Sequence, residues 1–158
     1  MTSLERARLL ALAVPAALLA GALGSQFIGG LYPCEMCHWQ RWPHYAAVVV
    51  ALAAFAAGRG PAVRPLVLVA AGLILLSGAI GAFHAGVEYH WWNGLTRCSA
   101  VSAGGSSADI LRQIVATPLI RCDEAQWRLF GISLAGYNAI LSLSLGSAII
   151  ALCLKRPR

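Results

Sequence analysis

The sequence predicts an all-α membrane protein whose four transmembrane helices form an antiparallel bundle. Of its 158 residues, 59% are hydrophobic and only 11% are charged, and the mean hydropathy is +0.71. A soluble domain would carry about a quarter charged residues. Charged residues, glycines and prolines separate four long apolar stretches, which cover residues 9–30, 39–57, 66–84 and 131–154.

Each apolar stretch is close to the roughly 20 residues that an α-helix needs to cross about 30 Å of hydrocarbon. None of them alternates polar and apolar residues as the strands of a membrane barrel do. Helices therefore satisfy the backbone polar groups of these stretches inside lipid. Neither an internal repeat nor a separate soluble domain is evident, so we expect one integral membrane domain over residues 1–158.

The first apolar stretch follows Arg6 and Arg8, so a cleaved signal peptide is the alternative interpretation. Its apolar run is longer than the usual signal core of about 7–15 residues. Cleavage would also leave an odd number of spans. We therefore expect this segment to remain in the protein as the first span.

Positive charges predict the orientation of the chain. The N-terminus, the short turn between the second and third stretches, and the C-terminal tail hold seven of the 12 Lys and Arg residues. Positive residues in short segments favour the cytoplasmic side, so both termini are expected in the cytoplasm. The net charge of +6 is then a topology signal. No phosphate loop or basic repeat is present, and we expect no nucleic-acid partner.

Two connections fall on the predicted outer face, at residues 31–38 and 85–130. The second is the only long one, and a loop of that length is usually functional or disordered. Within it, residues 107–115 have the pattern of a short amphipathic helix, with Ser107 as a possible N-cap and Pro118 beyond its end.

Four of the five cysteines lie on this outer face. Cys34 and Cys37 form a Cys-x-x-Cys motif between the first two spans, and Cys98 and Cys122 lie in the long loop. If the membrane is a bacterial plasma membrane, this outer face lies in an oxidising compartment, where disulfides form and persist. Cys153, at the opposite end of the fourth span, is expected to be a buried small apolar residue.

The four outer cysteines fit three kinds of site: structural disulfides, a Cys₄ zinc site, or a redox centre. The zinc pattern is incomplete because Cys98 and Cys122 are not closely spaced. The redox interpretation is favoured at Cys37, which opens a helix whose free N–H groups stabilise a thiolate. Arg41, one turn further on, adds a permanent positive charge.

These residues resemble a known family. The segment Tyr32-Pro-Cys34-Glu-Met-Cys37-His-Trp-Gln-Arg41 is similar to the Pro-Cys-x-x-Cys-x-x-x-Arg segment of the disulfide bond formation protein B (DsbB) family. The run Arg121-Cys122-Asp123-Glu124-Ala125-Gln126-Trp127 looks like the region of that family's last cysteine. The four spans fit as well, so the resemblance covers nearly the whole chain.

The resemblance implies a protein-dithiol:quinone oxidoreductase of the bacterial inner membrane. A periplasmic thioredoxin-fold dithiol oxidase, similar to DsbA, would attack the Cys98–Cys122 disulfide and form a mixed disulfide with Cys98. Cys122 would then attack the Cys34–Cys37 disulfide and pair with Cys34. Cys37 would be released beside a membrane quinone, either ubiquinone or menaquinone, with Arg41 stabilising its thiolate.

Further polar residues are candidates for the quinone site. Gln26 matches a glutamine at the outer end of the family's first span and could touch quinone or Cys37, although a polar contact between helices is the alternative. His84 and His90 flank the outer end of span three, and His90 fits better by its distance before Cys98. The candidate quinone-site residues are therefore Arg41, Gln26 and His90.

The remaining polar residues near the outer face receive structural interpretations. His38 and His44 are expected to face lipid headgroups, and Asn138 to bond across the bundle. No metal ligand is predicted under the redox interpretation. The principal alternative function is a membrane scaffold whose periplasmic disulfides are purely structural.

Overall fold

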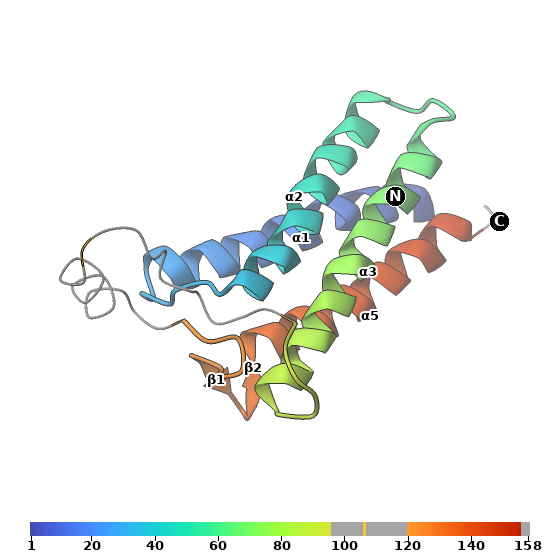
Figure 1. Cartoon of the computed structure of the whole chain (residues 1–158). Coiled ribbons are helices and arrows are strands. Elements are labelled where there is room, and N and C mark those ends of the chain that lie inside the picture. The colour runs from blue at the N-terminus through green and yellow to red at the C-terminus, as the bar shows by residue number, and fades with distance from the viewer. Residues whose placement is uncertain (96–105, 107–119, 156–158) are drawn as a thin grey trace.

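The computed structural model is α-helical and describes residues 1–95, 106 and 120–155. It contains four helices, α1 (Ser3–Phe27), α2 (Glu35–Ala56), α3 (Val63–Glu88) and α5 (Leu134–Leu154) (Figure 1). Two short strands, β1 (Arg128–Leu129) and β2 (Ile132–Ser133), pair as an antiparallel hairpin just before α5. Cys98 and the amphipathic helix expected at 107–115 lie outside the described residues.

Three of the helices, α1, α3 and α5, are long and apolar enough to cross a membrane. Helix α2 has 22 residues, a sufficient length. Its first turns carry Glu35, His38, Gln40 and Arg41, which lower its mean hydropathy. The predicted span over residues 39–57 of this helix therefore stays a prediction.

Side-chain caps define where several helices begin. Thr2 and Glu5 form a reciprocal capping box at the start of α1. The Ser133 hydroxyl accepts a hydrogen bond from the Gly136 N–H at the start of α5. At the start of α2 the same position is occupied by Cys34, so a reactive residue type serves as the cap.

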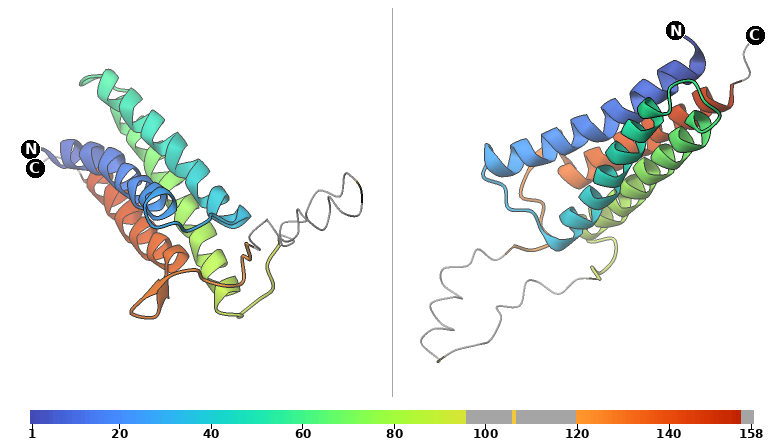
Figure 2. Two further views of the ribbon diagram at one scale, coloured as in Figure 1. Left: turned by 90° about the vertical axis from the view of Figure 1, so that its left-hand side faces the viewer. Right: turned by 90° about the horizontal axis from the view of Figure 1, so that it is seen from above.

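The helices pack side by side, with α3 against α2 and α5, and α1 against α2 and α5. The start of α1 and the end of α5 lie at the same end of the molecule (Figure 2). An apolar core rich in small residues fills that end and includes Ala11, Ala51, Ala70 and Cys153. The opposite end, beside the hairpin, contains most of the buried polar side chains. This polar end holds the candidate site.

Candidate active site

Cys34 and Cys37 lie at the first turn of α2. Cys34 is the N-cap, and its Sγ accepts a hydrogen bond from the Cys37 backbone N–H at 3.2 Å. The two sulfur atoms are 2.8 Å apart. Cys34 is buried, whereas Cys37 is half-buried. The helix start thus brings both sulfurs together and leaves Cys37 more exposed than Cys34.

The final part of the long loop, from residue 120, brings Cys122 to Cys34. The sulfurs of Cys34 and Cys122 and a ring nitrogen of His84 all lie within 4.8 Å of one another. Ile120 and Cys122 pack against an apolar cluster formed by Cys34, Met36 and Val87. Cys122 and Cys34 are therefore close enough for disulfide exchange after a small movement.

Two side chains of this segment, Arg121 and Gln126, make polar contacts, and the contact of Gln126 joins the segment to another part of the chain. The Arg121 guanidinium donates to both carboxylate oxygens of Asp123, at 2.9 and 2.6 Å, and lowers the pKa of Asp123 to about 2. The Gln126 side chain pairs with the backbone of Tyr32, accepting from its N–H at 3.0 Å and donating to its carbonyl at 2.5 Å. Gln126 thereby fastens the second outer connection to the first.

The two thiols of the Cys-x-x-Cys motif differ in acidity. A hydrogen bond from the Cys34 thiol lowers the pKa of Cys37, which precedes the predicted span. Hydrogen bonds with Cys122 and Cys37, together with burial, raise the pKa of Cys34. In the reduced pair, Cys37 is therefore the more readily ionised thiol of the two.

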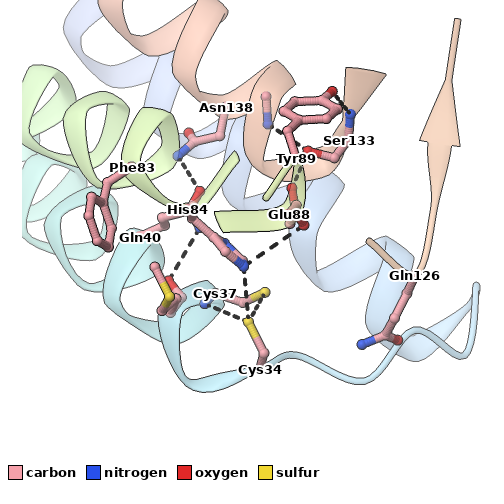
Figure 3. A network of polar contacts seen from close by, with 12 residues as sticks. Cys34, Cys37, Gln40, Phe83, His84, Glu88, Tyr89, Gln126, Ser133 and Asn138 are labelled. Atoms are coloured by element: carbon pink, nitrogen blue, oxygen red, sulfur yellow. Dashed lines mark hydrogen bonds and ion pairs between the residues drawn. The ribbon is translucent and has the colours of Figure 1, made fainter. Parts of the chain in front are cut away.

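His84 and Glu88 line the inner side of the cysteine pair from α3 (Figure 3). His84 Nε2 lies 3.5 Å from Cys34 Sγ, and its Nδ1 lies 2.7 Å from Gln40 Nε2. Glu88 Oε1 is 3.8 Å from His84 Nε2, and Glu88 Oε2 accepts a hydrogen bond from the Ser133 hydroxyl. A chain of buried polar groups thus begins at Cys34 and runs between the helices.

Arg41 and Gln26, both predicted site residues, are in direct contact. Arg41 is 9% exposed and donates to Gln26 Oε1 at 2.5 Å and to the Ala22 carbonyl at 3.1 Å. Gln26 thus accepts an interhelical hydrogen bond from Arg41, and this bond also fixes the guanidinium. The guanidinium and Cys37 line the same cavity.

A cavity of about 180 Å³ lies between α1, α2 and α5. Its walls are largely apolar, and Cys37, Arg41 and His44 are among its lining residues. A smaller cavity, of about 60 Å³, adjoins Cys34, His84 and Glu88 on the loop side. Cys37 and Arg41 line both cavities, so they occupy the boundary between them.

His44 contributes a buried nitrogen to this region. It is 3% exposed, and its Nε2 lies 3.0 Å from Asn138 Oδ1. Its Nδ1 is buried and has no hydrogen-bond partner among the described residues. Such an atom carries a free-energy penalty unless a ligand or water satisfies it. The expectation that His44 faces headgroups is therefore wrong for this structure.

His90, the histidine favoured by sequence spacing, lies elsewhere. It follows the end of α3 in a left-handed conformation with φ of 60°, and it is exposed. It is not among the residues that line either of the two cavities. Among the described residues, His84 is the histidine at the cysteines.

Sequence reasoning missed the contributions of Gln40, His44 and Glu88. A signal was present, because residues 37, 40, 41 and 44 are spaced to share one face of α2. Likewise, Glu88 is four residues after His84 on α3. Polar residues at such spacing within apolar helices mark functional sites in membrane proteins.

Comparison with known proteins decides the family. The family model of disulfide bond formation protein DsbB matches residues 5–152. The chain belongs to the DsbB family. Disulfide bond formation protein B of Marinobacter nauticus is 32% identical over 137 residues, covering 80% of this chain and 78% of that protein. The protein of the same name from Polaromonas sp. is 31% identical over 158 residues, covering 90% and 87%.

No solved structure matches the chain at a significant level. Membership of the DsbB family identifies a membrane protein of disulfide bond formation, as the resemblance predicted. The Cys₄ zinc alternative requires Cys98, which lies outside the described residues, so elemental analysis of the purified protein is its test.

Proposed function

We propose that this DsbB-family protein reoxidises a periplasmic, DsbA-like dithiol oxidase and passes the electrons to a membrane quinone. The observation that carries the proposal is the placement of the cysteines. Cys122 lies beside Cys34, while Cys37 lines the cavity between the helices. The two pairs then connect a water-soluble dithiol with a lipid-soluble oxidant.

The central step is exchange between the pairs. The Cys122 thiolate attacks Cys34 Sγ, the Cys34–Cys122 bond forms, and the Cys34–Cys37 bond breaks. The electron pair of the broken bond stays on Cys37 as a thiolate. The position of Cys37 in the first turn of α2 supports this direction, because the free N–H groups at a helix start stabilise a thiolate there.

The residues around the larger cavity fit a quinone. Apolar walls suit a ring with a lipid tail, and the buried Arg41 guanidinium can donate to a quinone oxygen. His44 Nδ1 is a further polar atom that a ligand there would satisfy. When bound, ubiquinone or menaquinone supplies the oxidising power. Arg41 and His44 would hold it, and Gln26 would hold Arg41.

Cys98 is the residue proposed to form the mixed disulfide with the partner oxidase, by the family resemblance. The cysteine pairs are proposed to face the periplasm from the bacterial inner membrane, with both termini in the cytoplasm. Positive charge at the two termini and at Arg59 and Arg64 supports this orientation.

Quinone reduction, followed by absorbance with a reduced thioredoxin-fold dithiol oxidase as donor, tests the proposal. We expect Cys37→Ser to abolish turnover. Cys98→Ala should block oxidation of the protein donor while a small dithiol still reduces quinone through the first pair. Cys153→Ala, at the other end of the bundle, serves as the matched control and should keep the parent rate.

Wild-type rates in both Cys37→Ser and Cys98→Ala would show the mechanism to be wrong. The scaffold alternative makes a different prediction, since a protein with purely structural disulfides would neither oxidise the donor nor consume quinone.

A further inference from the structure

His84 is a buried imidazole in contact with a reacting sulfur. It is 1% exposed, and its Nε2 lies 3.5 Å from Cys34 Sγ. Its other nitrogen, Nδ1, lies 2.7 Å from the side-chain nitrogen of Gln40 (Figure 3). Which ring nitrogen carries the proton decides what this residue can do for the sulfur.

The amide of Gln40 has one orientation. Its Oε1 accepts a hydrogen bond from Asn138 Nδ2 at 2.9 Å, and its Nε2 donates to the Met36 carbonyl at 3.2 Å. Asn138 is itself oriented, because its Nδ2 also donates to the Ser77 carbonyl at 3.2 Å. Its Oδ1 accepts from the Ser142 hydroxyl at 2.9 Å. The atom of Gln40 that faces His84 is therefore a donor.

This donor determines the tautomer of His84. Nδ1 must accept the Gln40 hydrogen bond, and a neutral imidazole with an accepting Nδ1 carries its proton on Nε2. A proton on Nδ1 would place two N–H donors against each other at 2.7 Å. Gln40 thus disfavours both the other tautomer and the imidazolium.

The Nε2–H of His84 faces the exchanging cysteines. It reaches Cys34 Sγ and the backbone of Cys122. Glu88 Oε1, at 3.8 Å, lies beyond hydrogen-bond distance, and its carboxylate is bonded to Ser133. Cys34 Sγ therefore has two donors aimed at it, the Cys37 backbone N–H and the His84 imidazole.

We propose that His84 is a fixed hydrogen-bond donor to the Cys34 sulfur and does not act as a proton acceptor. The role rests on the proposed exchange between the cysteine pairs. An incoming thiolate attacks Cys122 Sγ in the Cys34–Cys122 disulfide and forms a new bond to it. The Cys34–Cys122 bond breaks, and its electron pair goes to Cys34 as a thiolate. Pre-oriented donors stabilise such developing charge in a buried site.

The test uses a background in which Cys37→Ala and Cys98→Ala leave Cys34 and Cys122 as the outer cysteines. The Cys37→Ala change keeps the backbone N–H that donates to Cys34. After oxidation, dithiothreitol opens the Cys34–Cys122 disulfide at pH 7, and a maleimide polymer reports the freed thiols by gel shift. Neither quinone nor partner protein is required.

Two substitutions separate a donor from an acid–base group. His84→Gln keeps an N–H donor near the Nε2 position but cannot exchange protons at neutral pH, and it should open at nearly the parent rate. His84→Leu removes the donor and should open about tenfold or more slowly, the usual effect of a hydrogen bond to a charged group. Equal slowing by Gln and Leu, or slowing by neither, would overturn the proposal.

Formation of the disulfide and its opening rate test different claims. If Cys34 and Cys122 do not form a disulfide in the background variant, the exchange step of the proposed function is wrong. If the disulfide forms and opens at a rate independent of residue 84, only the His84 role is wrong.

Nitrogen-15 NMR of the unsubstituted chain provides a second measurement that does not depend on how His84→Leu folds. The resonances of His84 are assigned by their loss in His84→Gln. A proton on Nε2 and an unprotonated Nδ1 at pH 7 are expected, and a protonated Nδ1 would contradict the proposal.

Discussion

Arg41 is positioned from outside its own helix. Its guanidinium donates to Gln26 and to the Ala22 carbonyl, both on α1, while its backbone lies in α2. These contacts account for two donor groups and leave a nearly buried cation at the boundary of both cavities. A quinone oxygen or a Cys37 thiolate would meet a charge that is already in place.

Replacing Arg41 should weaken quinone binding at the proposed site. We expect Arg41→Ala to raise the apparent KM for quinone by about tenfold or more, because a charge-assisted hydrogen bond is lost. Arg41→Lys keeps the charge but cannot hold both α1 contacts. Its apparent KM should lie between those of the unsubstituted protein and Arg41→Ala. Steady-state quinone reduction at varied quinone concentration gives these values, and an unchanged KM in Arg41→Ala would remove Arg41 from the site.

The acidity of Cys37 makes a prediction about pH. The Cys34 hydrogen bond lowers the pKa of Cys37, so in the quinone-free dithiol protein its thiolate should persist below the ordinary cysteine pKa of about 8.5. As the pH is lowered, the rate at which iodoacetamide alkylates Cys37 should therefore fall at a lower pH than it does for an ordinary cysteine. In Cys34→Ala the decline should move to higher pH, as mass spectrometry of the Cys37 peptide would show. Identical pH profiles for the unsubstituted protein and Cys34→Ala would show that Cys34 does not lower the pKa of Cys37.

Sequence spacing did not identify which histidine near the end of α3 lies at the cysteines. Distance to Cys98 favoured His90, but α3 ends at Glu88 and leaves His90 exposed beyond it. His84 lies one helical turn before Glu88 and faces Cys34. The predicted span ended at residue 84, whereas α3 continues to Glu88. The tautomer of His84 depends on Gln40 and Asn138, which come from two other helices, and spacing along the chain carries no information about that contact.

At the scale of the elements, α3 and α5 approach closely at Gly81. A Cβ at this position would lie 2.9 Å from Asn138 Nδ2 and 3.0 Å from the Ala135 carbonyl. Gly72, on the same helix, has nothing within 4 Å of the corresponding position. The two glycines form a matched pair in which only one is required for packing.

Gly81→Ala should destabilise the protein by about 1–3 kcal/mol, the range for overpacking a close contact. Gly72→Ala should be neutral or slightly stabilising, since alanine is the better helix former. Thermal unfolding in detergent measures both. Equal melting temperatures for the two variants would show that α5 moves away from α3 at little cost.

The connection between the outer segments rests on Gln126. Gln126→Ala removes both hydrogen bonds to Tyr32 and should slow formation of the Cys34–Cys122 disulfide in the Cys37→Ala, Cys98→Ala background. Gln126→Glu keeps an acceptor for the Tyr32 N–H but loses the donor, and it should show an intermediate rate. The rate under a fixed oxidant is followed by gel shift, and an unchanged rate in Gln126→Ala would exclude this anchor.

The hairpin before α5 could not be predicted from the sequence. The stretch expected to begin a span at residue 131 instead contains a turn and β2, and α5 begins at Leu134. Phe130 and Gly131 both have positive φ, at 51° and 80°, as a two-residue type I′ turn requires. Gly131 suits such a turn, but phenylalanine is not a residue that signals one.

At the scale of the whole molecule, the two ends differ in chemistry. Small apolar residues fill the end with the termini, and buried polar groups gather at the other. Composition predicted helical spans, and three of the helices that the structure describes are long and apolar enough to cross a membrane. Cys34 and Cys122 lie at the polar end, and Cys153 lies in the apolar core at the other end. The approach of Cys122 to Cys34 was available only from the family resemblance, because the residues that fasten the loop are far apart in sequence.

The proposed orientation predicts one-sided labelling. In spheroplasts under reducing conditions, a membrane-impermeant maleimide should modify the half-buried Cys37 and Cys122 from outside. Cys153, which is buried near Arg64 at the opposite end, should react only after solubilisation and denaturation. Mass spectrometry of the labelled peptides identifies the sites, and outside labelling of Cys153 would reverse the assigned topology.

Cys37 and Arg41 line both cavities, so one sulfur of the Cys34–Cys37 pair lies at the partition between a space open to the loops and a space among the helices. Under the proposed function, the reductant and the oxidant would never occupy the same chamber. The reductant or the oxidant could then be replaced by a chemically different molecule with no change in the residues that line the other cavity. Substitutions that enlarge the helix-side cavity should change which oxidant is used while leaving the choice of dithiol partner unaffected.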